Sequence, residues 1–135
     1  MIDINKLLTP PKTISVVGLS DKSERPSNQV AKYLMGLGLT IIPVNPNIES
    51  VFGLKSYSSI SDIPKDLKID IVDIFRKESE VLAIVEEVIK TGQKPVLWLQ
   101  EGFFDQQSKI LAQQNNLELV EGMCLMKAFE RKMAY

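Results

Sequence analysis

Histidine is absent from this chain of 135 residues, and cysteine occurs once, as Cys124. Without histidine the chain cannot build a Ser-His-Asp triad, a histidine-ligated zinc site or a phosphohistidine relay. One cysteine cannot form an internal disulfide, which suits a reducing compartment. Few spaced carboxylates accompany it, so we expect no metal cluster. These absences predict a protein that is not an enzyme in its own right.

Long apolar runs and a large net charge are lacking as well. No run approaches the roughly 20 residues that span a bilayer, and residues 1–12 lack the basic-then-apolar layout of a secretory signal. The 16 basic and 17 acidic residues leave a formal net charge of −1, which offers no general attraction for nucleic acid or an anionic membrane. We therefore expect a cytoplasmic protein that binds neither, and any anion site must be local.

What the sequence does contain is an alternation of short apolar runs with segments of helical spacing, typical of one globular domain over 1–135. Such alternation calls for right-handed βαβ crossovers and a parallel sheet. The fold class is therefore α/β: a Rossmann-like, doubly wound, five-stranded parallel sheet in three α/β/α layers. We expect strands at 13–17, 39–44, 69–75, 95–99 and 117–120, and helices at 2–8, 27–37, 79–90, 105–114 and 125–132.

Proline and serine add local expectations. Pro43 lacks the N–H for a ladder bond, so we expect a bulge near it. Ser27 stands where it can cap the free amides of the first long helix. The lead-in helix should end at Thr9-Pro10-Pro11, because proline cannot continue a helix. Segment 51–57 reads as irregular or as a short edge segment, and 61–64 as a single helical turn.

The segment 14–27 organises the rest of the chain, because it reads as a buried strand, a loop with two cations and the start of a helix. Gly18 lets the backbone turn sharply and approach closely whatever lies beyond the strand. A helix N-terminus offers free amides and partial positive charge to a phosphate. Lys22 and Arg25 add full positive charge nearby. We interpret this segment as a phosphate-binding loop.

Parallel strands deliver their last residues to one edge of the sheet, where a doubly wound fold binds its ligand. That edge gathers cations, amides and a ring, which suits phosphates and a purine and lacks an obvious acid–base pair. Arg76 could instead pair with Asp73 or Glu78. The delivered residues are Gly18, Leu19 and Ser20, then Asn45 and Pro46, then Phe75, Arg76 and Lys77, then Gln100, Glu101 and Gly102, and lastly 121–124.

The loop after the first strand lacks features of a nicotinamide dinucleotide site, and this bears on which nucleotide it could bind. Nicotinamide dinucleotide sites usually carry Gly-x-Gly-x-x-Gly and an acidic residue after the second strand. Here Ser20 replaces the second glycine, no third follows, and the second strand ends in Val44-Asn45-Pro46. An adenosine ribose that bears a phosphate would favour this missing carboxylate. NADP and coenzyme A both have such a phosphate, so both stay open on these grounds.

Four ordered motifs at the strand ends match a known family. The chain resembles the stand-alone CoA-binding proteins, relatives of the CoA-binding domain of succinyl-CoA synthetase alpha subunits and acyl-CoA synthetases. The resemblance covers nearly the whole chain. The motifs are Val16-Val17-Gly18-Leu19-Ser20 through Glu24-Arg25-Pro26-Ser27, Ile42-Pro43-Val44-Asn45-Pro46, Asp70-Ile71-Val72-Asp73-Ile74-Phe75-Arg76 and Leu97-Trp98-Leu99-Gln100.

The resemblance implies a Rossmann-type fold with coenzyme A or an acyl-CoA as its ligand. It places Ser20, Arg25 and Ser27 near phosphates, Asn45 and Pro46 by the adenosine, and Phe75 and Arg76 beside the ligand. This chain departs from the family pattern at Glu101-Gly102-Phe103-Phe104 and at Gly122-Met123 before Cys124. The expected cofactor-binding residues are Gly18, Leu19, Ser20, Lys22, Arg25, Pro26, Ser27, Asn45, Pro46, Phe75, Arg76, Gln100 and Gly102.

Two further functions stay open beside CoA binding. An NADP-dependent oxidoreductase would need a hydride acceptor site and a proton donor, and neither Tyr33 nor Tyr57 has a recognisable catalytic spacing. A regulatory interaction module with a vestigial pocket would be favoured if Phe103-Phe104 and 123–129 were exposed, since such patches suit an enzyme partner or a homodimer. We expect Trp98 in the core. Cys124 reads as an inert buried thiol, with a mixed disulfide to CoA as the alternative.

Overall fold

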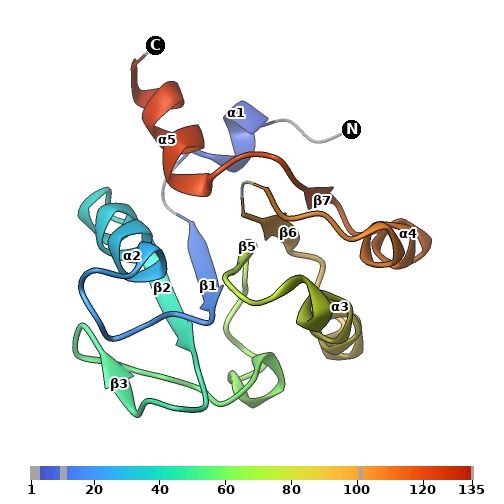
Figure 1. Ribbon diagram of the computed structural model, residues 1–135, viewed down its shortest axis with the longest axis horizontal. Coiled ribbons are helices and arrows are strands. Elements are labelled where there is room, and N and C mark those ends of the chain that lie inside the picture. Colours follow the sequence, from blue (N-terminus) through green and yellow to red (C-terminus); the bar gives the residue numbers. More distant parts are fainter. Residues whose placement is uncertain (1–3, 10–11, 101, 135) are drawn as a thin grey trace.

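The computed structural model describes residues 4–9, 12–100 and 102–134; the expected helix end at 10–11 and the strand-end residue Glu101 lie outside them. A five-stranded parallel sheet stands between two layers of helices (Figure 1). The predicted fold class, a Rossmann-like α/β fold, is confirmed. In order across the sheet, the strands are β2 (Thr40–Val44), β1 (Thr13–Val17), β5 (Ile71–Ile74), β6 (Val96–Leu99) and β7 (Leu119–Val120).

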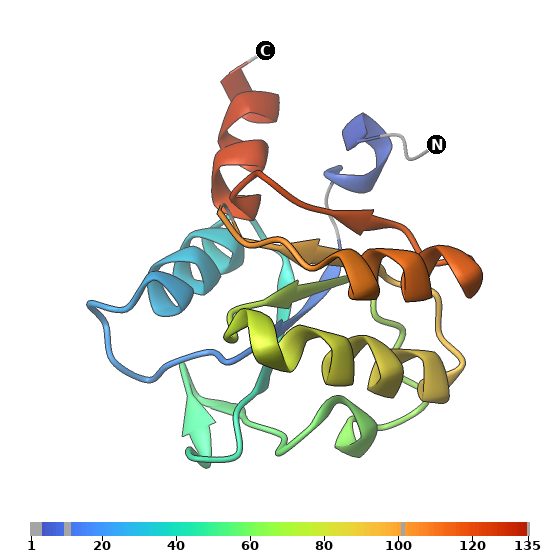
Figure 2. The ribbon, with the colours of Figure 1, turned by 45° about the vertical axis from the view of Figure 1, so that its right-hand side comes forward.

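Helices cover both faces of this sheet. α2 and α5 contribute to one core cluster, and α3 and α4 contribute to the other. Figure 2 shows α3 and α4 side by side, in agreement with their mutual contacts. The helices are α1 (Ile4–Leu7), α2 (Pro26–Gly36), α3 (Glu78–Thr91), α4 (Gln106–Gln114) and α5 (Leu125–Ala134).

The strands alternate their side chains between the two clusters. Along β1, Ile14 and Val16 join the cluster of α2 and α5, and Val17 joins that of α3 and α4. Along β5, Ile71 and Val72 divide in the same way. Because both faces are covered, strands of a parallel sheet read as nearly continuous apolar runs. This is why the strands were recognisable in the sequence.

Pro43 causes no bulge, so that expectation is wrong. The register of β1 with β2 runs without interruption from Thr13–Thr40 to Val17–Val44. Thr40 N donates to Lys12 O, so the backbone N–H and C=O groups of every second residue of β2, starting with Thr40, point toward β1. Pro43 therefore faces the outer edge, where its carbonyl accepts from Tyr57 N at 3.0 Å. The missing N–H thus falls outside the ladder.

The connection from β2 to β5 contains little regular secondary structure, as expected. It contains a small hairpin of β3 (Ser50–Val51) and β4 (Leu54–Lys55), followed by the 3-10 helix η1 (Ile60–Asp62). η1 begins and ends earlier than the helical turn expected at 61–64. The chain leaves β1 toward β2 and later returns to β5 on the other side of β1. The strand order therefore reverses between β1 and β5, where open α/β sheets bind ligands at the carboxyl ends.

Candidate functional site

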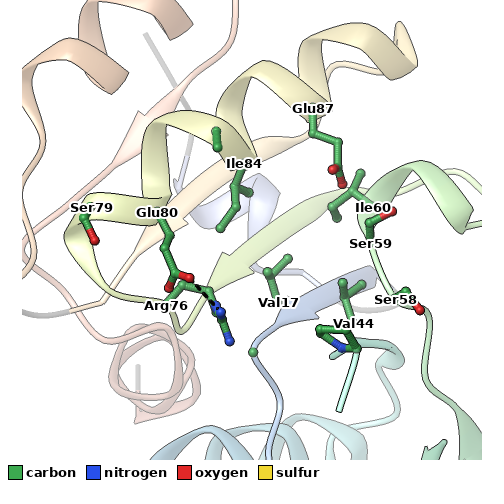
Figure 3. Close-up of a pocket in the computed structure, with 13 residues that line it drawn as sticks. Val17, Val44, Ser58, Ser59, Ile60, Arg76, Ser79, Glu80, Ile84 and Glu87 are labelled. Carbon is green, nitrogen blue, oxygen red and sulfur yellow. Dashed lines mark hydrogen bonds and ion pairs between the residues drawn. The ribbon is translucent and has the colours of Figure 1, made fainter. Parts of the chain in front are cut away.

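Three hollows with shared walls follow the carboxyl edge of the sheet. The loop hollow, about 440 Å³, is lined by Gly18, Ser20, Lys22, Arg25, Pro26, Ser27, Asn45, Phe75 and Arg76. The α3 hollow, about 350 Å³ and drawn in Figure 3, is lined by Val17, Gly18, Val44, Pro46, Ser58, Ser59, Ile60, Arg76, Ser79, Glu80, Ala83, Ile84 and Glu87. The α5 hollow, about 490 Å³, is lined by Pro26, Phe75, Arg76, Lys77, Gln100, Phe103, Cys124 and Lys127. Arg76 borders all three.

The loop after β1 begins at Gly18, whose backbone lies against the end of β5. Its φ of +89° is in the left-handed region, and a Cβ there would lie 2.3 Å from the Phe75 carbonyl oxygen. Gly18 N donates to Val44 O at 2.7 Å. Only glycine tolerates both the dihedral and the contact. Gly18 therefore holds the ends of β1, β2 and β5 close together beneath the loop.

Side chains from the start of α2 fix the loop. Ser27 Oγ accepts from Ser20 N at 3.0 Å, and Asn28 Nδ2 donates to Ser20 O at 2.9 Å. The Ser20 hydroxyl in turn accepts from Lys22 N at 3.1 Å. The expectation that Ser27 caps the helix is wrong. Arg25 holds the cap position, and its side chain makes no capping hydrogen bond. The first turn of a helix leaves its amides without intrahelical acceptors. Those of Ser27 and Asn28 have no hydrogen-bond acceptor among the described residues, so an anion could bind there.

Asn28 is a site residue that the sequence reasoning missed. It is 4% exposed, although asparagine is seldom buried. A signal was available: Asn28 stands three residues before Ala31, on the face that α2 turns to the core. A polar amide in that register needs a buried partner.

Asn45 braces the same loop from β2. Its Nδ2 donates to Leu19 O at 2.9 Å, and its backbone N–H is shared between Ser56 Oγ and Tyr57 O. Leu19 itself is fully buried in the core, and it borders none of the three hollows. Both residues therefore shape the loop, and their predicted contact with a ligand stays a prediction.

Arg76 pairs with Glu80, and the expected alternatives Asp73 and Glu78 are wrong. Arg76 Nη2 lies 2.8 Å from Glu80 Oε1, one turn into α3 (Figure 3). Glu80 Oε2 accepts from Lys77 N at 3.3 Å. The hydrogen bond from Arg76 is the main reason that the pKa of Glu80 is lowered, with smaller contributions from Lys77. The ion pair holds the Arg76 guanidinium over the junction of the hollows.

Asp73 is a fully buried acid in the middle of β5. Its Oδ1 accepts a hydrogen bond from Gln100 Nε2, at the end of β6, and its Oδ2 has no partner among the residues that the structure describes. Burial raises the pKa of Asp73 well above its usual value, and the Gln100 hydrogen bond opposes that rise. The sequence signal is a carboxylate inside an apolar strand, and the sequence-based expectation for Asp73 is limited to a pairing with Arg76.

The remaining expectations divide among the hollows. Pro46 borders the α3 hollow and Gln100 the α5 hollow. Gly102 borders none of the three, so its ligand contact stays a prediction. Trp98 is in the core as expected, and its Nε1 donates to Met123 O at 2.7 Å. Cys124 is only half-buried, since it forms part of the α5 hollow.

The apolar residues that could mark a partner surface are mostly covered. Phe104 is 53% exposed, whereas Leu125 and Phe129 are completely buried. Phe103 is half-buried against the second core cluster. Among the described residues, no group of three or more acidic or cysteine side chains is placed to hold a metal ion. None of the helices in that part of the chain is long and apolar enough to span a bilayer.

This strand order, with a cation-lined hollow at the switch point, is typical of the nucleotide-binding α/β proteins. Residues 12–130 match the family described as "CoA binding domain". The chain therefore belongs to this family, which confirms the resemblance inferred from the four motifs.

Relatives of two sizes match the chain. "Uncharacterized protein YneT" of Bacillus subtilis is 35% identical over 123 residues, which covers 91% of this chain and 89% of that protein. The ADP-forming 4-hydroxybutyrate–CoA ligase of Nitrosopumilus maritimus is 32% identical over 125 residues, covering 85% of this chain and 18% of the ligase. The chain thus spans less than a fifth of that ligase.

Solved structures share the architecture. A hypothetical protein from Pyrococcus horikoshii OT3 superimposes with a TM-score of 0.89 at 40% identity, over 96% of this chain and 89% of that one. A protein from Thermus thermophilus gives a TM-score of 0.88 at 27% identity, over 97% and 99% of the two chains. The fold is therefore shared over essentially the full described length.

Proposed function

We propose that this protein binds coenzyme A, or an acyl-CoA, across the three hollows and catalyses no reaction by itself. The loop hollow is the observation that carries the proposal. Lys22 and Arg25 from the loop and Arg76 from the end of β5 border one cavity. The first amides of α2 lie beside it, and a helix N-terminus with nearby cations is a ready phosphate site.

The two other hollows supply what the rest of such a ligand needs. The α3 hollow has apolar walls from Val17, Val44 and Ile84, with Pro46 at its border, which suits the adenosine. The α5 hollow has Phe75 and Phe103 in its walls, which suits an alkyl arm. Since both adjoin the loop hollow, one extended ligand can occupy all three with its phosphates in the middle. Micromolar affinity requires only about −8 kcal/mol.

Binding without catalysis is consistent with the side chains that the sequence contains. The sequence contains no histidine, and the ligases that share this domain are more than five times longer than the matched segment, which is 18% of one of them. We propose that the protein serves as a carrier or sensor of CoA, or as the CoA-binding partner of an enzyme.

Thermal unfolding with CoA, dephospho-CoA, NAD and NADP tests the proposal. A ligand at a hundred times its Kd stabilises by about 2.7 kcal/mol, or about 10 °C for a domain of this size. We expect CoA to raise Tm by that amount, dephospho-CoA less, and NAD and NADP hardly at all. A shift with NADP alone would support an NADP-dependent oxidoreductase. No shift with any of the four ligands would support a regulatory interaction module with a vestigial pocket.

Arg25→Ala tests the phosphate site within that experiment. Arg25 is exposed and makes no cap with its side chain, so its loss should leave the apo Tm unchanged while it abolishes the shift with CoA. Lys32→Ala removes an exposed cation from the same helix away from the hollows, and should keep the shift. An undiminished shift in Arg25→Ala would remove that residue from the site.

A further inference from the structure

Asp73 is the buried ionisable group that the proposed binding leaves unexplained. It stands in the central strand of the sheet and is completely buried. A buried carboxyl group destabilises a fold unless hydrogen bonds compensate for lost hydration. Within the described part of the chain, Asp73 has one such bond, from Gln100, while its Oδ2 has none. An apolar residue would serve the core better at this position, so packing alone does not account for the acid.

The side chain of Gln100 connects this acid to the α5 hollow. Asp73 lies on the face of β5 that carries Ile71, and therefore on the side of α2 and α5. Gln100 borders the α5 hollow together with Pro26, Phe75 and Phe103. Its amide nitrogen donates to Asp73. Its Oε1 has no hydrogen-bond partner among the described residues, so the pairing leaves a carbonyl acceptor at the border of a largely apolar hollow.

We propose that Gln100 binds an N–H donor on the arm of the ligand through this acceptor, and that Asp73 is the positioning residue that keeps the amide turned that way. The inference rests on the proposed function. The arm of coenzyme A carries two secondary amides, each with one N–H, and a primary-amide oxygen held in place is a matching acceptor. A few fixed polar groups in an apolar pocket set the orientation of a ligand. The protein would therefore distinguish pantetheine-type nucleotides from armless ones at Gln100.

Calorimetric titration compares CoA with adenosine 3′,5′-bisphosphate, which lacks the arm and one phosphate of the diphosphate. A variant that weakens the binding of CoA alone has lost a contact outside the part that the two ligands share. The wild type should bind CoA more tightly than the bisphosphate. Gln100→Leu should lower the affinity for CoA about five- to tenfold, the worth of roughly one hydrogen bond, and leave the affinity for the bisphosphate unchanged. Asp73→Leu should do the same, because Gln100 then loses its anchor.

Two further variants distinguish positioning from a structural role. Asp73→Asn keeps an oxygen that accepts from Gln100, so it should retain the wild-type affinity for CoA. Asp70→Leu is the matched control: Asp70 accepts from Thr13 N at 2.8 Å, at the opposite edge of the sheet, and its loss should not change the ratio of the two affinities. In Asp73→Leu/Gln100→Leu, the loss should equal that of Gln100→Leu alone.

Several results would overturn the inference. Equal affinity of the wild type for both ligands would mean that the arm is not read, while nucleotide binding would stand. An equal loss for both ligands in Gln100→Leu would make its role structural, and an unchanged affinity for CoA in that variant would remove the contact; either result decides the matter even if Asp73→Leu fails to fold. Binding of neither ligand by the wild type would overturn the proposed function itself.

Discussion

Gly18 and Asp73 are the two single residues on which the carboxyl edge of the sheet depends most. Gly18 brings the backbone of the β1 loop against the Phe75 carbonyl, and Asp73 carries a carboxyl group into the core. A strand would otherwise favour a residue with a side chain at position 18 and an apolar residue at position 73. Both residues lie beside the hollows. Features that cost stability are often found at functional sites. Both costs can be measured directly.

Gly18→Ala should lower the free energy of unfolding by at least about 2 kcal/mol, because positive φ and a backbone clash add. The Cβ would lie 2.3 Å from Phe75 O, so the ends of β1 and β5 must separate. Gly38→Ala is the control: φ is +87° there, but nothing lies within 4 Å of the added Cβ. It should cost only about 1 kcal/mol. Urea unfolding compares them, and equal costs would refute the close approach at Gly18.

Asp73 should make the protein less stable as pH rises. Its pKa is raised in the folded state, so between the usual value near 4 and the raised value the unfolded chain releases a proton that the folded chain keeps. Stability is then lost with increasing pH. Asp73→Asn removes this titration, so its Tm relative to wild type should increase from about pH 4 upward. A difference in Tm that is constant with pH would contradict a raised pKa.

At the scale of elements, the contact between the β1 loop and the start of α2 prepares the phosphate site before any ligand arrives. Ser20 is held on its N–H and its carbonyl by the two adjacent residues Ser27 and Asn28. Asn45 holds the preceding carbonyl, that of Leu19, from β2. A loop fixed in this way loses little conformational entropy on binding, which favours affinity.

Asn28→Ala tests that preparation. The variant leaves the Ser20 carbonyl without its buried partner, so we expect stability to fall by about 1–2 kcal/mol and the affinity for CoA to fall with it. Hydrogen exchange of the amides in 19–25 should accelerate by more than the loss of global stability explains. Exchange in β6 should change only as much as global stability does. Gln29→Ala serves as control, since the Gln29 side chain makes a long contact of 3.5 Å with Glu24 O. Unchanged exchange in the loop of Asn28→Ala would contradict the bracing role.

The elements were largely predictable because their physical signals are local. The strand expected at 13–17 is β1 with the same bounds, since a β-branched run between loop residues leaves little choice. The bulge at Pro43 was wrong because the outcome depended on which edge its missing N–H would face, and that is set by the pairing with β1 and Tyr57. The partner of Arg76 likewise depended on the turn into α3, where Glu80 is one turn away.

At the scale of the whole molecule, the topology converts scattered sequence motifs into one edge. Segments from β1, β2, β5 and β6 meet there because parallel strands end together. Most residues expected at the site border one of three adjoining hollows. The sequence carries a signal that Asn28 and Asp73 are buried, but it does not reveal their partners Ser20 and Gln100, and their roles depend on those contacts.

The most direct test of the account is a titration of the isotope-labelled protein with CoA, followed by the backbone amide signals of its nuclear magnetic resonance spectrum. The shifts should concentrate at 18–28, 75–80 and 100–103, while the signals of Gly38 and Gly92, at the opposite ends of their helices, should hardly move. Shifts confined to that opposite edge of the sheet, or none at saturating CoA, would contradict this prediction.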